Sequence, residues 1–81
     1  MRTARLFVNS NRQKSELVEK KFAEWAATNP ELTSTIELIL DDPVEAVRLQ
    51  IFRTPALVVD DVVLGMDIHS AEMLQLLLDA Q

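Results

Sequence analysis

The sequence has 81 residues and contains no cysteine, only one glycine and only one histidine. Without cysteine, thiol–disulfide exchange is excluded, because a thiolate is the attacking group in that chemistry. A single histidine without cysteine does not supply the ligands of a tetrahedral zinc site. One glycine is too few for the glycine-rich loop that cradles phosphates in nucleotide-binding proteins. We therefore expect no redox activity, no metal and no cofactor.

Long apolar runs are also missing. No segment reaches the roughly 20 apolar residues that a membrane-spanning helix requires. The apolar run near the N-terminus, Leu6–Val8, is too short for the core of a signal peptide. The lack of cysteine fits a reducing compartment, where disulfides are rare. We expect a cytoplasmic protein with no membrane partner.

Positive charge is scarce and unevenly distributed. The net charge is −5, with six basic and three acidic side chains in residues 1–30 but two basic and ten acidic ones in residues 31–81. Nucleic-acid phosphates are bound by clustered lysine and arginine. We therefore expect no nucleic-acid partner, and we interpret the basic residues around Arg12 to Lys21 as part of a solvated helix face.

Hydrophobic side chains, by contrast, make up 48% of the sequence. A chain of this length is expected to form a single domain, residues 1–81, that buries only about 60–65% of the surface exposed by its unfolded form. Because neither disulfides nor a metal site can stabilise the domain, its stability must come from packing. Self-association to a homo-oligomer remains open as a further source.

Hydrophobic periodicity and turn residues predict six segments. They are a strand over residues 5–9, a helix over 14–28, a strand over 35–40, a helix from Asp42, a hairpin of 56–59 and 62–64 around Asp60–Asp61, and a helix after Ser70. Ser10 and Gln13 have the spacing of a capping box for the first helix. Asp42 and Ser70 are the expected N-caps of the second and third helices. We expect His69, just before the last helix, to be exposed and remote from the Ser10 loop, so that no serine–histidine pair forms.

The expected inner faces follow from the same periodicity. A strand buried on at least one face is predicted at residues 35–40, since it is β-branched and apolar. The helical stripes that should face the core repeat at three and four residues. They are Val18, Phe22, Trp25 and Ala26 in the first helix, Val44, Val47 and Ile51 in the second, and Met73, Leu74, Leu77 and Leu78 in the third.

The order of segments predicts the fold class. A strand–helix–strand unit closes with a right-handed crossover and a parallel strand pair. Adding a helix, an antiparallel hairpin and a last helix gives an α/β fold of βαβαββα order. Its four-stranded mixed sheet has helices on both faces, which is the thioredoxin-like architecture.

The segment Thr54-Pro55-Ala56-Leu57 resembles a signature of the thioredoxin-like superfamily. Thioredoxins, glutaredoxins and glutathione-transferase N-domains carry a cis-proline just before the third strand. The resemblance implies a cis Thr54–Pro55 bond, whereas an X–Pro bond without that context is cis in only about 5–6% of cases. In related proteins the segment before this proline pairs with an extended peptide.

Among cysteine-less members, the chain is most similar to the KaiB clock-protein family and the related sensor domain of the kinase SasA. Residues 7–15 resemble KaiB's Tyr-Val-Ala-Gly-Asn-Thr-Pro-Asn-Ser, with identity at Val8, Asn11 and Ser15, and the interval from Pro43 to Pro55 is also similar. The resemblance implies a protein-interaction module without catalytic activity, whose partner is an ATPase or a kinase. The alternative is a thiol-free binding domain like those of glutaredoxins or glutathione transferases, associated with an enzyme.

The expected partner surface follows from the predicted topology. The loop after the first strand and the loop before the third meet at one end of such a sheet. Basic side chains and a helix N-terminus there would suit an acidic or carbonyl-rich segment of a partner. The predicted partner-binding residues are Asn9, Ser10, Asn11, Arg12, Lys14, Arg53, Thr54 and Pro55.

Overall fold

A computed structural model describes residues 2–81 and has the predicted βαβαββα order. Two short 3-10 turns, Arg12–Ser15 and Ile39–Asp41, precede the first and second α-helices. The strands and helices are β1 (Thr3–Val8), α1 (Glu16–Ala27), β2 (Thr33–Leu38), α2 (Pro43–Arg48), β3 (Ala56–Val59), β4 (Val62–Gly65) and α3 (Ala71–Asp79).

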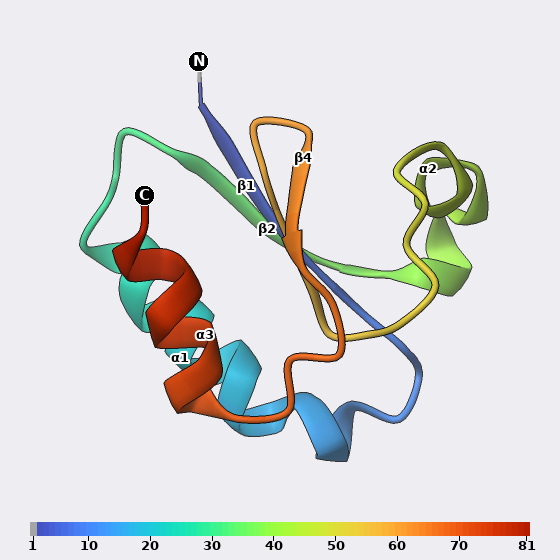
Figure 1. Cartoon of the computed structure of the whole chain (residues 1–81), viewed down its shortest axis with the longest axis horizontal. Coiled ribbons are helices and arrows are strands. Elements are labelled where there is room, and N and C mark those ends of the chain that lie inside the picture. Colours follow the sequence, from blue (N-terminus) through green and yellow to red (C-terminus); the bar gives the residue numbers. More distant parts are fainter. Residues whose placement is uncertain (1) are drawn as a thin grey trace.

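The four strands form one mixed sheet in the order β2-β1-β3-β4. Strand β1 pairs in parallel with β2 and antiparallel with β3, which in turn pairs antiparallel with β4. Helices α1 and α3 lie together on one face of the sheet, and α2 lies on the other (Figure 1). The predicted fold class, thioredoxin-like with helices on both faces, is confirmed.

Each face of the sheet has its own hydrophobic core, because successive side chains of the central strands point to opposite faces. The larger core lies under α1 and α3, and Trp25, Leu38, Leu64, Met73 and Leu77 pack partly buried at its margin. Its buried members are Ala4, Leu6, Val8, Val18, Phe22, Leu57, Val59, Ile68, Leu74 and Leu78. The smaller core, under α2, consists of Phe7, Ala46, Ile51, Ala56 and Val58.

The capping box predicted for the first helix is wrong. Helix α1 begins at Glu16 rather than Lys14, and Ser10 is not its N-cap. The side chain of Asn9 accepts a hydrogen bond from the Asn11 N–H at 2.9 Å, which starts a local turn instead. The Ser15 hydroxyl lies 3.2 Å from the Arg12 carbonyl and 2.6 Å from Glu19 Oε2, which stabilises the 3-10 turn.

The predicted caps of the other two helices and the predicted hairpin are confirmed. Asp42 accepts a hydrogen bond from the Glu45 N–H at 3.2 Å, and Ser70 accepts one from the Met73 N–H at 3.1 Å. The two turn residues between β3 and β4, Asp60 and Asp61, have φ values of 51° and 65°. Positive φ at both central residues is the requirement of a type I′ turn, for which aspartate is suited.

Strand β2 lies two residues earlier than predicted, and its predicted burial is wrong. It occupies an edge of the sheet, and residues 33–36 are exposed while Glu37 and Leu38 are half-buried. Ile39 and Leu40, which the apolar run assigned to the strand, belong to the following 3-10 turn. A β-branched run predicts a strand, but only the strand order decides how much of it is covered.

The inner stripe predicted for the second helix is wrong at Val44 and Val47 and confirmed at Ile51. Val44 and Val47 are exposed, whereas Ala46 and Ile51 are buried. The stripe assumed a helix that continues to Ile51, but α2 ends at Arg48 and Gln50 has a φ of 59°. The Ile51 N–H donates to the Ala46 carbonyl at 2.8 Å, which closes a Schellman turn and carries Ile51 back to the core.

Candidate interaction surface

Two loops emerge at the end of the sheet where β1 ends and β3 begins. Phe7 pairs with Ala56 at this end, so the chain leaves β1 beside the point where it enters β3. We call the surface formed by residues 9–15 and 53–55 the Pro55 end (Figure 1). The Thr54–Pro55 bond is cis, as the resemblance implied. The structure therefore brings the two predicted loops together.

Most of the predicted partner-binding residues are accessible. Thr54 and Pro55 are half-buried, because they run directly into the buried strand β3. The Pro55 carbonyl accepts a hydrogen bond from the Ile68 N–H at 3.0 Å, which ties the segment after β4 to the same end. The exposed members are Asn9, Ser10, Asn11, Arg12, Lys14 and Arg53.

The same hydrogen bond corrects the expected position of His69. This residue is exposed, as predicted, but its neighbour Ile68 contacts Pro55, so His69 lies near the Pro55 end and not remote from it. Within residues 2–81, the His69 side chain forms no hydrogen bond or ion pair. The hydroxyl of Ser15 is bonded to Arg12 and Glu19 instead. A serine–histidine pair is therefore not assembled here.

Carboxylates balance the positive charge of the Pro55 end. Arg12 forms an ion pair with Glu19, and Arg53 lies 3.9 Å from Asp67. Partial burial raises the pKa of Glu19, but hydrogen bonds from Arg12 and Ser15 outweigh this and hold that pKa below its ordinary value. Glu16 and Glu19 occupy the first turn of α1, where they compensate its helix dipole. The expected preference for an acidic partner segment therefore has no electrostatic support.

Exposed apolar side chains are instead frequent in and around α2. Val44 and Val47 share the side of α2 opposite the buried Ala46, and Leu40 lies in the 3-10 turn that precedes this helix. We call Leu40, Val44 and Val47 the α2 patch. Phe52 lies between the patch and Arg53 in the chain, and all four side chains are 74–78% exposed. They are half of the eight exposed large hydrophobic residues in the described part of the chain.

An ion-pair network missed by the sequence analysis anchors α2 to the sheet. Arg5 in β1 donates to both carboxylate oxygens of Glu37 in β2, at 2.6 and 3.0 Å, and to Glu45 in α2 at 2.5 Å. Its guanidinium also lies 4.7 Å from the ring centre of Phe7. Arg48 donates to both oxygens of Glu45 at 2.5 and 2.8 Å. An arginine inside an apolar strand was the available signal, but its partners lie 32 and 40 residues away.

The network lowers the pKa values of both carboxyl groups. Hydrogen bonds from Arg48 and then Arg5 lower the pKa of Glu45 to about 2. The hydrogen bond from Arg5 holds the pKa of Glu37 below its ordinary value, although partial burial opposes it. Both groups are therefore ionised at neutral pH, and α2 is held in a defined position.

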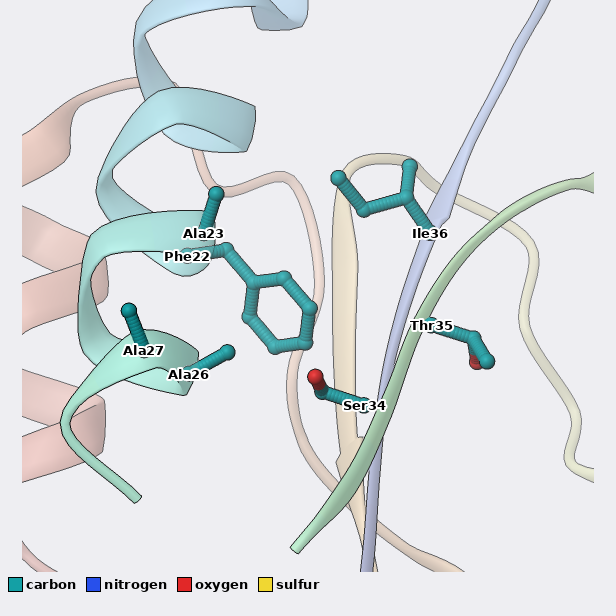
Figure 2. A pocket seen from close by; sticks show the side chains of 7 residues that line it. All are labelled: Phe22, Ala23, Ala26, Ala27, Ser34, Thr35 and Ile36. Carbon is teal, nitrogen blue, oxygen red and sulfur yellow. The ribbon is translucent and has the colours of Figure 1, made fainter. Parts of the chain in front are cut away.

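A groove lies on the other face of the sheet, between α1 and β2. This groove has a volume of about 450 Å³. Figure 2 shows the ring of Phe22 between the helix and the strand, with Ser34 and Ile36 directed to the α1 side and Thr35 directed away. The groove was not predicted because Phe22 was assigned simply to the core. Its lining residues are Phe22, Ala23, Ala26, Ala27, Ser34, Thr35 and Ile36.

Fold and surface together define a thioredoxin-like α/β domain without cysteine. Over residues 2–81, no group of three or more histidine, aspartate or glutamate side chains is arranged to hold a metal ion. None of the described helices is both long and apolar enough to cross a membrane. No family model matches the chain, and no curated protein matches it.

Proposed function

We propose that this chain is a non-catalytic, KaiB-like protein-interaction module that regulates an ATPase or kinase partner. Its partner binds across the Pro55 end, Phe52 and the α2 patch. The observation that carries this proposal is the group of four strongly exposed apolar side chains within residues 40–52, the segment that leads in the chain to Arg53 and the cis-proline. Several strongly exposed apolar residues on one segment of a small domain are typical of interaction sites, because leaving them in water is unfavourable.

The surroundings of the α2 patch indicate the chemistry of the partner surface. The exposed carboxylates Asp41 and Asp42 border the patch at the start of α2. A complementary surface therefore combines apolar side chains at its centre with lysine or arginine at its rim. Phe52 is the best candidate for a binding hot spot, since large aromatic side chains dominate interface energies. Thr54, before the cis-proline, is available to pair with an extended segment of the partner.

The anchoring of α2 supports the same proposal. Ion pairs from Arg5 and Arg48 meet on Glu45 and hold the helix against the sheet. A surface that is already ordered loses less conformational entropy when it binds. The network thus presents Val44 and Val47 to a partner in a fixed arrangement.

Site-specific photo-crosslinking tests where the partner binds. A photoreactive residue at position 53 is expected to capture one protein in the native host, and the same residue at position 31 is expected to capture none. Glu31 is an exposed control at the opposite end of the sheet, because it precedes β2, which runs parallel to β1. Equal capture from both positions would contradict binding at the Pro55 end.

Variants then measure the contribution of each surface with the purified partner. The double substitution Val44→Asp/Val47→Asp is expected to weaken binding by about 10- to 100-fold, because two apolar hot-spot contacts are lost. The double substitution Arg12→Glu/Arg53→Glu is expected to weaken it by only about 3- to 10-fold, through loss of the Arg12–Glu19 and Arg53–Asp67 ion pairs that order the Pro55 end. Leu76→Asp is the matched control, as Leu76 is 74% exposed on α3, on the other face of the sheet.

Circular dichroism confirms that each variant is folded before its affinity is measured. The proposed surface is wrong if the folded α2 variant binds as tightly as the native protein, or if Leu76→Asp weakens binding equally. The glutathione-binding alternative is tested separately by isothermal titration with glutathione. We expect no binding heat, whereas heat that disappears in the Arg53→Glu protein would favour the alternative.

A further inference from the structure

In the described part of the chain, no other strand lies beside the outer side of β2. β2 is the terminal strand of the sheet, and its register with β1 runs without interruption from Thr33 to Leu38. The Thr33 N–H donates to the Arg2 carbonyl at 3.0 Å, so the backbone groups of Thr33 face the neighbouring strand. Because these groups alternate along a strand, those of Ser34 and Ile36 point outward. This edge can therefore accept another strand.

Charge does not protect this edge. Natural proteins commonly block edge strands with lysine, proline or a β-bulge. Glu37 is the one charged residue in β2, and both of its carboxylate oxygens are bound by Arg5. Its side chain is directed to the α2 face, where Thr35 also contacts it at 2.9 Å. The edge itself thus carries only small polar and apolar side chains.

The groove between α1 and β2 continues this edge on the opposite face. Ser34 and Ile36 point toward α1, beside the exposed alanines 23 and 27 (Figure 2). A strand added to β2 would place alternate side chains on this face, next to Ile36. The groove, at about 450 Å³, has room for apolar side chains from such a strand.

We propose that the chain forms a two-fold symmetric dimer in which β2 pairs antiparallel with β2 of a second copy. With Thr35 on the two-fold axis, Ser34 lies opposite the second copy's Ile36, so the outward backbone groups of both residues pair. Each copy then brings its Ile36 to the α1 face of the other, beside the groove. Glu37 lies opposite the second copy's Thr33, and no like charges oppose each other.

The distribution of charge allows a second copy to bind at this surface. Each chain carries a net charge of −5, so two copies repel each other across most orientations. The groove lining contains no charged residue, so two acidic copies can approach here without bringing like charges together. The α2 patch is less suitable, because a symmetric contact there would bring Asp41 and Asp42 of both copies together. An isologous contact at β2 also pairs the outward backbone groups of Ser34 and Ile36 in both copies at once.

This dimer is independent of the proposed partner binding. It uses β2 and the α1 side of the sheet, whereas the partner surface uses the Pro55 end and α2 on the other face. Loss of one interaction is therefore not expected to abolish the other, and each experiment reports on its own surface.

Sedimentation equilibrium over a concentration series tests the dimer. The native protein is expected to reach twice the 9.2 kDa mass of the chain. Ile36→Lys is expected to remain at 9.2 kDa, since it introduces like charges at the paired edges, while circular dichroism shows that it is folded. A native protein that stays monomeric throughout, or an Ile36→Lys protein that still dimerises, would overturn the proposal.

A disulfide trap tests the arrangement. The natural sequence contains no cysteine, so a single introduced cysteine can form a disulfide only with a second copy. Directly opposed residues of a non-hydrogen-bonded antiparallel pair have Cα atoms about 4.5 Å apart, within the range that a disulfide spans. Thr35→Cys is therefore expected to form covalent dimers rapidly on oxidation. Val62→Cys, exposed on the opposite edge strand β4, is the matched control and should react slowly. Equal rates for the two variants would contradict pairing through β2.

Discussion

Replacing Phe7 with alanine is expected to lower the free energy of unfolding by about 3–5 kcal/mol and to release α2 from the sheet. Phe7 is completely buried and is the largest side chain of the smaller core. The other members of that core are small or aliphatic, so no neighbour can fill the space left by the ring. A domain of this length has a total stability of only about 4–12 kcal/mol.

Hydrogen exchange distinguishes local release of α2 from general destabilisation. In the Phe7→Ala protein, amide protons of α2 should exchange faster than those of α1, whose contacts belong to the larger core. Phe22→Ala is the matched control, because Phe22 is equally buried but lies in the larger core. If Phe7→Ala lowers the free energy of unfolding by less than about 1 kcal/mol, or leaves the hydrogen-exchange protection of α2 unchanged, Phe7 does not hold this helix.

Replacing Arg5 with methionine is expected to destabilise the protein by about 2–3 kcal/mol at pH 7. Arg5 is only 17% exposed, and its removal leaves the carboxylates of Glu37 and Glu45 near each other without their shared cation. Breaking a fully buried pair typically costs about 3–5 kcal/mol, and residual solvent access reduces that value here. Methionine retains much of the apolar stem, so packing against Phe7 is largely kept.

The dependence of stability on pH identifies the ionic part of this effect. Hydrogen bonds from Arg48 and Arg5 lower the pKa of Glu45 from 4.5 to about 2, and that of Glu37 is also lowered. Such groups contribute stability that is present above the unfolded-state pKa and is lost as pH falls through the folded-state pKa. The stability of the native protein should therefore fall between pH 4.5 and about 2.

The difference in the free energy of unfolding between the native and Arg5→Met proteins should become smaller over the same pH range. Protonation of Glu37 and Glu45 removes the attraction to Arg5, which the variant already lacks. Urea unfolding at a series of pH values measures both curves. Arg48→Met is the control, since Arg48 is 51% exposed and its loss should have a much smaller effect at pH 7. Equal losses of stability in the Arg5→Met and Arg48→Met proteins would show that the Arg5 contacts contribute little. A stability difference between the native and Arg5→Met proteins that does not change with pH would show the same.

The two proposed surfaces have a joint consequence. Pairing through β2 would give a dimer with two Pro55 ends and two α2 patches, both accessible. Such a protein binds a multi-subunit partner with an avidity above its single-site affinity when the spacing of the sites matches. Comparing the native protein with the monomeric Ile36→Lys variant would show whether dimerisation strengthens partner binding.

Several features of this protein are determined by local sequence. The absence of cysteine excludes thiol chemistry whatever the fold. Asp42 and Ser70 cap their helices, and the aspartates at 60 and 61 form the hairpin turn, because these preferences depend on residues only a few positions apart. The order βαβαββα follows from the succession of such segments. The cis Thr54–Pro55 bond was implied by resemblance rather than by spacing.

Other features depend on contacts between distant segments, and only the tertiary structure decided them. Arg5 meets Glu37 and Glu45 because β2 and α2 both lie beside β1, which no local pattern reveals. Val44 and Val47 have apolar side chains at helical spacing, yet the early end of α2 turns Ala46 and Ile51 inward instead. Strand order likewise left β2 at an exposed edge and brought Ile68 beside Pro55. Hydrophobic periodicity predicts that a face prefers burial, but the neighbours that cover it are selected by the packing of the whole chain.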